Sequence, residues 1–142
     1  MIQYADSERL EFPEYFEFLH RTDLGQQYVA KNFAERVRTM LANLDVVVTA
    51  RDDGKLVGVC LGITDFAYFL FFTDLGVDRS YVGQGIGREL VQRCIHVAGG
   101  PKDITVMTIS HDDAIPFYAK CEMTNTPNLV VRYCDDDEPL SL

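Results

Sequence analysis

The sequence predicts an α/β (α+β) fold with a mixed, mostly antiparallel central sheet and helices on both faces. Three observations support this prediction. Strand-like runs separated by turn signals fill the middle of the chain and indicate an antiparallel meander. Stretches with apolar residues at helical spacing lie before and after the meander. A further strand pattern follows the second of these helices, so a helical crossover should join two parallel strands.

The chain, residues 1–142, is predicted to form one domain, because its length suits one hydrophobic core and it contains no internal repeat. We divide it into four parts by pattern. Residues 1–44 should form N-terminal helices, and residues 45–77 the antiparallel meander. Residues 78–123 follow as a glycine-containing core, and residues 124–142 as a last strand with an acidic tail.

The region before the meander reads as helical, with a break near Asp23-Leu24-Gly25. Between residues 28 and 44, apolar side chains recur at helical spacing, at Val29, Phe33, Val37, Met40, Leu41 and Leu44. Charged residues occupy the opposite side of this stretch. The pattern predicts an amphipathic helix that packs on the sheet.

Three strands make up the predicted meander. Residues 45–51 form a β-branched run that ends at Asp52-Asp53-Gly54, and Asp-Gly between two such runs predicts a hairpin. Residues 56–63 are the returning strand. Residues 67–72 follow as a third strand and are apolar on both alternating faces. We therefore expect residues 67–72 to be a central strand that is covered on both sides.

The second half of the chain alternates between helix and strand. A helix should begin at the glycine cluster and run to about Ala98, where Gly99-Gly100-Pro101 ends it. Residues 104–110 then form a strand parallel to the strand over 67–72. A short helix over 114–121 and a last strand over 129–134 complete the order. The acidic residues 135–139 should be a solvated tail, because adjacent like charges repel one another.

The charge balance limits the possible partners. Aspartate and glutamate number 22 against 13 lysines and arginines, which gives a formal net charge of −9. Nucleic acids and anionic membranes both require a basic face, so neither is an expected partner. The charge is compatible with a cationic amine, although acidity that only maintains solubility is the favoured explanation. No apolar signal core is present near the N-terminus, which predicts a cytoplasmic protein.

The potential metal ligands are scattered along the chain. The four cysteines form no Cys-x-x-Cys pair and lie among apolar neighbours, and the three histidines are equally dispersed. This distribution favours small buried side chains over disulfides or metal ligands. No structural metal is therefore predicted.

The glycine cluster Gly83-Gln84-Gly85-Ile86-Gly87 opens the second predicted helix. Glycines let the backbone turn tightly and approach an anion, and the free amides at a helix start donate to it. Three glycines at alternate positions exceed the need of a simple turn, which favours an anion site. A P-loop would need Gly-Lys followed by Ser or Thr, and the dinucleotide motif would need glycine at the position of Arg88.

The residues around this cluster resemble the GNAT superfamily of acyl-coenzyme A-dependent N-acetyltransferases. Its first signature is a strand with an apolar-x-Val end, a turn, and Gln/Arg-x-x-Gly-x-Gly/Ala opening a helix. The chain offers residues 75–81 and then 82–90 in that order. Its second signature, typically Asn-x-x-Ala with a Phe-Tyr pair, resembles residues 111–123. Val82 stands where Gln or Arg is usual, and His111 stands in place of the Asn.

The resemblance implies a role for each matched residue, with residues 78–123 as the cofactor-binding core. Peptide groups of Leu75 and Val77 would pair with the pantetheine arm of acetyl-coenzyme A. The segment from Val82 through Gly83, Gly85 and Gly87 to Arg88 would hold the pyrophosphate, and His111 would contact the cofactor arm. Tyr118 would lie near the sulfur and protonate the leaving thiolate. A splay between the fourth and fifth strands would admit the thioester between Val77 and Ile109.

The chemistry of aminolysis adds one candidate. Thioester aminolysis needs an unprotonated amine, oxyanion stabilisation and a proton for the departing sulfur. Tyr118 suits the last role because a phenol is protonated at neutral pH. Asp74 follows an apolar strand and immediately precedes Leu75. It is the candidate base, and an exposed carboxylate at a strand end is the equally weighted alternative.

We therefore predict an N-acetyltransferase that moves an acetyl group from acetyl-coenzyme A to a primary amine by direct attack. The alternatives are a non-catalytic coenzyme A-binding sensor or partner-binding module and, less favoured, a phosphate-binding regulatory domain. The acceptor classes left open are small molecules, antibiotics, peptides and protein lysines. A homodimer through the last strands is a further hypothesis.

Overall fold

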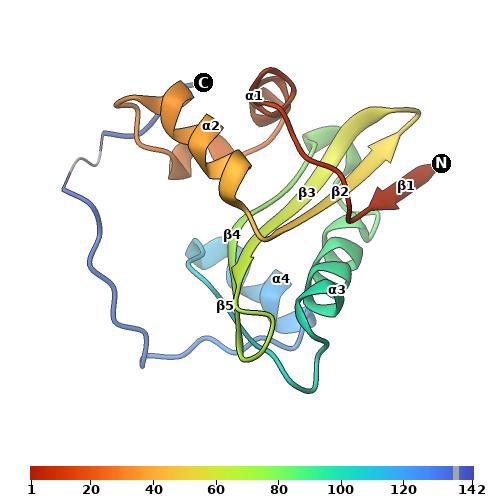
Figure 1. Ribbon diagram of the computed structural model, residues 1–142, viewed down its shortest axis with the longest axis vertical. Helices are drawn as coiled ribbons and strands as arrows, with labels where there is room; N and C mark the ends of the chain where they lie inside the picture. The colour runs from red at the N-terminus through yellow and green to blue at the C-terminus, as the bar shows by residue number, and fades with distance from the viewer. Residues whose placement is uncertain (136–137) are drawn as a thin grey trace.

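In the residues that the computed structural model describes, 1–135 and 138–142, five strands form one sheet in the order β1-β2-β3-β4-β5 (Figure 1). Strands β1 to β4 pair antiparallel, and β4 pairs with β5 in parallel through the α3 crossover. Their bounds are β1 Ile2–Ala5, β2 Val46–Asp52, β3 Lys55–Thr64, β4 Phe69–Val77 and β5 Thr105–Thr108. The predicted meander and parallel crossover are confirmed.

Helices cover both faces of this sheet, as predicted (Figure 1). One face carries α1 Phe12–His20 and α2 Phe33–Asn43, which pack on β2 and β3. The other carries α3 Ile86–Ala98 and α4 Ile115–Lys120. Three short 3-10 helices connect these elements: η1 Leu24–Gln27, η2 Arg79–Tyr81 and η3 Asp112–Ala114.

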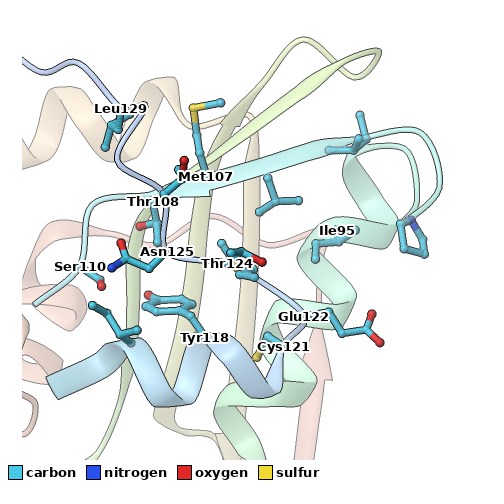
Figure 2. A pocket seen from close by; sticks show the side chains of 16 residues that line it. Ile95, Met107, Thr108, Ser110, Tyr118, Cys121, Glu122, Thr124, Asn125 and Leu129 are labelled. Carbon is cyan, nitrogen blue, oxygen red and sulfur yellow. The ribbon is translucent and has the colours of Figure 1, made fainter. Parts of the chain in front are cut away.

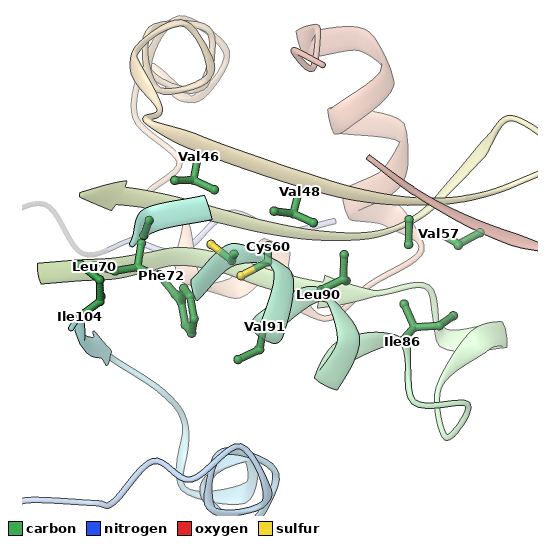
Figure 3. Close-up of a cluster of buried hydrophobic side chains, with 13 residues drawn as sticks. Val46, Val48, Val57, Cys60, Leu70, Phe72, Ile86, Leu90, Val91 and Ile104 are labelled. Atoms are coloured by element: carbon green, nitrogen blue, oxygen red, sulfur yellow. The ribbon is translucent and has the colours of Figure 1, made fainter. Parts of the chain in front are cut away.

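The α3 face contains a continuous apolar core (Figure 3). Val46 and Val48 of β2 point into it, whereas Val47 between them belongs to the core under α1 and α2. This alternation follows from the two-residue period of a strand. The buried stripe of α3 supplies Leu90 and Val91 to the same core. Each fully buried aliphatic side chain contributes about 1.5–3 kcal/mol, so this core anchors the start of α3 on the sheet.

The N-terminal region differs from the prediction. Residues 2–5 form β1 and pair with β2, whereas the sequence reading placed only helices there. The apolar stretch 28–44 becomes the shorter helix α2, because Asn32 adopts a left-handed conformation with a φ of 54° that starts the helix after it. Tyr28 therefore lies outside the helix and is free to point elsewhere.

The predicted last strand over 129–134 is wrong. These residues form no ladder in the structure and lie exposed, with Val130 94% accessible. A strand pattern describes what a segment can pair with, and here no partner strand lies beside it. The strand predicted over 67–72 instead spans Phe69–Val77, and Phe69 is 54% exposed, so it is not covered on both sides.

The described residues of the predicted acidic tail, Asp135, Glu138 and Pro139, are exposed, as expected. Asp136 and Asp137 lie outside the described residues. Beyond them, the main chain returns to the α1/α2 side, which was not predicted. The amide of Ala30 donates to the carbonyl of Glu138 at 2.9 Å, and the amide of Leu140 donates to the backbone carbonyl of Tyr28 at 2.8 Å. Local charge patterning does not predict this backbone pairing, because its partners lie about a hundred residues away in sequence.

Candidate functional site

Strand β4 changes its neighbours halfway along its length. Its first residues pair with β3 on one side and β5 on the other, and the β5 pairing ends at Phe72 opposite Thr108. The Thr108 hydroxyl donates to the Phe72 carbonyl at 3.0 Å at this last step. Residues 73–77 continue along β3 alone. The two parallel strands therefore separate at this end of the sheet.

The peptide groups of Leu75 and Val77 face that separation. The amide of Asp78 donates to the Val57 carbonyl at 2.8 Å, so Asp78 points its backbone toward β3. Peptide groups alternate in direction along an antiparallel strand, so those of Gly76 also point toward β3. Those of Leu75 and Val77 point away from β3. They are the backbone groups available to a ligand strand, whereas the amide of Gly76 is not.

The glycine loop opens the α3 helix with exposed main chain. Gly83 and Gly85 both have a φ of +82°, and a Cβ added at either would meet nothing within 4 Å. Glycine is required here by backbone conformation and not by packing. Gly85 is the N-cap of α3, and no side chain caps it. The first amides of the helix thus lack an intrahelical acceptor, which makes this start a favourable place for an anion.

Gly87 joins the two sequence motifs in space. A Cβ at this position would lie 3.2 Å from two ring carbons of Phe117 in α4. Glycine therefore lets α4 approach the first turn of α3. Val82 and Arg88 flank this loop and are exposed, and His111 before α4 is exposed as well. The positions matched to the two motifs come together at one end of the sheet.

Tyr118 projects from α4 toward β5 on the α3/α4 face (Figure 2). It lines a cavity of about 350 Å³ between β5, α4 and the segment that follows α4. Figure 2 shows Thr108, Ser110 and Asn125 on the side of the cavity toward which the phenol points. Burial raises the pKa of Tyr118 to about 12. The phenol is therefore protonated throughout the neutral range and serves as a hydrogen-bond donor.

Asp74 lies on the opposite, α1/α2 face of β4 and is only 2% exposed. The alternative of an exposed carboxylate at a strand end is thus excluded. The phenols of Tyr15 and Tyr28 both donate to its Oδ2 atom. Burial raises the pKa of Asp74, and the two phenol hydrogen bonds counteract part of that rise.

The other carboxylate oxygen of Asp74 has no partner. Among the described residues, Oδ1 of Asp74 is one of two buried side-chain oxygens that form no hydrogen bond. Leaving such an atom unsatisfied costs about 1–3 kcal/mol, and more when it carries charge. Gln27 and Thr73 also lie close enough to this carboxyl to lower its pKa, but neither forms a hydrogen bond to Oδ1.

Asp78, four residues further on, has a different environment. Burial alone would raise its pKa, but hydrogen bonds from the Ser80 amide at 2.8 Å and from Arg21 at 2.5 Å lower it. Lys55 lies 3.8 Å away. Asp78 is thus a saturated structural carboxylate that ties α1 and η2 to β4. Asp74 remains the only one of the two with an unused oxygen.

Sequence reasoning missed the two phenols as site residues. Tyr15 lies 59 residues from Asp74 in the chain and Tyr28 lies 46 residues from it. Tyr15 belongs to the buried stripe of α1, where its spacing indicates only core packing. Tyr28 lies between η1 and α2, outside any helix or strand. No local motif contains either residue, so the contact depends on the tertiary fold.

Other site classes find less support in the structure. Across residues 1–135 and 138–142, no three His, Cys, Asp or Glu side chains converge in a way that would hold a metal ion. Cys60 and Cys94 are buried in the core, and burial raises the pKa of Cys60. In that same part of the chain, every helix is too short or too polar to span a bilayer.

A family model agrees with this arrangement. The model described as the acetyltransferase (GNAT) family matches residues 4–123. The match includes the sheet, the glycine loop and α4, and it ends where α4 gives way to the exposed C-terminal segment. The sequence matches no curated protein.

Several solved structures share the fold. A probable acetyltransferase from meticillin-resistant Staphylococcus aureus superposes with a TM-score of 0.77 at 20% identity, covering 95% of this chain and 99% of its own. An aminoglycoside acetyltransferase from an uncultured soil metagenomic sample, in complex with sisomicin, gives 0.67 at 20% identity, with coverages of 94% and 95%. Glucosamine-6-phosphate N-acetyltransferase from Arabidopsis thaliana gives 0.61 at 18% identity, with coverages of 95% and 99%. At these identities the likeness concerns the fold.

Proposed function

Because the chain belongs to the GNAT family of acetyltransferases, we propose that it transfers an acetyl group from acetyl-coenzyme A to a primary amine by direct attack. One observation carries this proposal. The separated end of β4 exposes the peptide groups of Leu75 and Val77 between a buried carboxylate on one face of the sheet and a phenol on the other. Nucleophile activation and leaving-group stabilisation need groups on opposite sides of a thioester.

Acetyl-coenzyme A is the proposed cosubstrate, and the residues present fit it. The exposed amides from Gly83 to Arg88 would hold the pyrophosphate, with Val82 beside it, and His111 would contact the cofactor arm. The charge of Arg88 would add to the potential of the helix start. Leu75 and Val77 would pair with the pantetheine arm as an added strand would. This pairing would direct the thioester into the separation between β4 and β5.

In the proposed reaction, the amine nitrogen attacks the thioester carbonyl carbon, and the carbon–sulfur bond breaks. Asp74 is the base that takes the proton lost by the nitrogen. The amide of Val77 is the available donor for the developing oxyanion. Tyr118 gives its phenol proton to the sulfur as it leaves, which yields free coenzyme A. The phenolate then regains a proton from solvent, to which Asp74 releases the proton that it took from the amine. The products are an amide and a thiol.

A thiol-release assay with acetyl-coenzyme A and a panel of amines tests this function. The panel should contain amino sugars, polyamines, free amino acids and peptides with lysine. Amino sugars come first because two structural neighbours are named as acetyltransferases of such compounds. Turnover of at least one class is expected. Binding of coenzyme A without turnover of any class would instead support the sensor or partner-binding alternative.

The remaining partner assignments also rest on sequence and exposure. With a net charge of −9, we propose no nucleic-acid or membrane partner, and a cytoplasmic location stays a prediction. A homodimer is proposed because the apolar side chains of Leu129, Val130 and Tyr133 are exposed on the C-terminal segment. Light scattering on the wild type and on Val130→Lys tests it. A monomeric wild type would refute the dimer.

A further inference from the structure

We propose that Tyr15 and Tyr28 are positioning residues that hold one oxygen of Asp74 and thereby present the other to the acceptor amine. This inference rests on the proposed function, since it assigns a task to the base of that reaction. It adds two residues that lie outside both sequence motifs. Neither phenol is required to touch the acetyl group or coenzyme A.

The two phenols reach the carboxylate from different elements. Tyr15 lies within α1 and is fully buried, and Tyr28 follows η1. Both donate to the same atom, Oδ2 of Asp74, and their own oxygens lie 3.1 Å apart. A phenol has one proton to donate, and each of these two phenols donates it to this oxygen. The carboxylate is therefore fixed from two directions and cannot rotate without losing both bonds.

The second carboxylate oxygen of Asp74, Oδ1, has a different environment from Oδ2. This atom is buried and has no hydrogen-bond partner within the described part of the chain. An ionised carboxylate accepts hydrogen bonds at both oxygens, and only this one remains unused. A nitrogen that carries a proton would supply the missing donor. Oδ1 is thus an acceptor held in a fixed position, to which the nitrogen of the amine would donate.

The surroundings of Asp74 are polar but lack a paired cation. Gln27 donates to the Thr73 carbonyl at 3.0 Å beside it, and the sulfur of Met40 in α2 lies 3.9 Å from the Tyr28 oxygen. The titratable groups that interact with Asp74 are the phenols of Tyr15 and Tyr28 and the thiol of Cys60 on β3. An incoming ammonium group would be the first positive charge at the carboxylate.

A purely structural role would also place hydrogen bonds here, since they join α1 and η1 to β4. The two roles differ in one measurable respect. Hydrogen bonds to an ionised carboxylate favour the ionised form, so removing one raises the carboxyl pKa. A structural tie alone would change stability and leave the pH dependence of acetyl transfer unaltered.

The test compares Tyr28→Phe and Tyr15→Phe with the control Tyr81→Phe. Tyr81 also donates its phenol to a carboxylate, Asp52, at 2.8 Å, but on the exposed hairpin side. In Tyr28→Phe, the acid limb of kcat/KM for the amine should move up by about 1 pH unit, with an unchanged Kd for acetyl-coenzyme A. Tyr15→Phe should show the same shift. If Tyr15→Phe does not fold because Tyr15 is fully buried, Tyr28→Phe still tests the inference.

A second measurement does not depend on activity. The carboxyl carbon of Asp74, followed by NMR titration of the protein without substrates, should titrate at higher pH in Tyr28→Phe than in the wild type. An unchanged titration would overturn the inference even in an active enzyme, as would an equal shift of the acid limb in Tyr81→Phe. A shifted titration in a protein that acetylates no amine would instead refute the proposed function, leaving the hydrogen bonds established.

Discussion

The α3/α4 face of the sheet assembles its proposed cofactor groups from one stretch of chain, whereas the α1/α2 face joins three side chains from distant segments. On the first face, residues 75–88 provide backbone amides and Tyr118 provides a phenol. On the second, Asp74 meets Tyr15 and Tyr28 across 59 and 46 residues of sequence. The comparison shows two ways to build a site from one sheet.

The difference has a chemical basis. A diphosphate and a pantetheine arm are recognised mainly by main-chain groups, which every residue carries. We therefore expect this face to bind the cofactor with Val82 and His111 in place of the side chains that the family pattern usually has. An amine must instead be met by a particular side-chain oxygen. The α1/α2 face, where we propose that the amine meets Asp74, should therefore depend on exact side-chain identity. Single substitutions should then affect either amine turnover or cofactor binding, according to the face that they change.

The largest effect is expected from Asp74→Asn. Loss of the base should lower kcat/KM for the amine by about 10³-fold, because general base catalysis contributes about 10²–10⁴-fold. The Kd for acetyl-coenzyme A, measured by calorimetry, should not change. Asp78→Asn is the matched control, since it removes a nearby buried carboxylate that is already saturated. Equal losses of activity per folded molecule in both variants would contradict the assignment of the base.

On the cofactor face, Gly85→Asp should weaken acetyl-coenzyme A binding by about 100-fold, because a carboxylate would face the pyrophosphate at the start of α3. Gly54→Asp is the control. Gly54 has a φ of +84° and the same open surroundings, but it lies in the β2–β3 hairpin. Backbone strain is therefore matched, and only position differs. Similar affinities in the two variants would remove the proposed anion site.

For Tyr118→Phe we expect a chemical step about tenfold slower, which is the worth of one hydrogen bond to a developing charge. Pre-steady-state release of thiol would measure that step, and Kd for acetyl-coenzyme A should be retained. The raised pKa, about 12, makes this residue a donor and not a strong acid, so a modest loss is expected. A wild-type rate would exclude any role for the phenol.

The smallest effect concerns two aspartates that lie four residues apart. The folded pKa of Asp74 is raised, so activity should fall as pH decreases through that value. The folded pKa of Asp78 is lowered, so its contribution to stability is present above its unfolded pKa of about 3.9 and is lost as pH falls further. As the pH is lowered, activity should therefore be lost at a higher pH than the pH at which the protein unfolds. Coincident loss of activity and circular dichroism would contradict this separation.

Much of the fold could be predicted from local pattern. The Asp53-Gly54 hairpin, the apolar stripe of α3 and its glycine stop each depend on neighbours within a few residues. Strand β1 was missed because four residues carry too little periodicity to reveal a strand. The last strand failed for the opposite reason, since residues 129–134 have the right pattern but do not join the sheet.

The sequence alone determined the elements from β2 to α4, their order and the position of the glycine loop, because hydrophobic period, turn residues and backbone freedom are local properties. Only the tertiary structure decided that β4 parts from β5 after Phe72, that Asp74 is buried, and that Tyr15 and Tyr28 share one of its oxygens. Those facts depend on packing between segments that are far apart in the chain. Long-range packing, unlike a turn or a helix stripe, leaves no signature at any single point in the sequence.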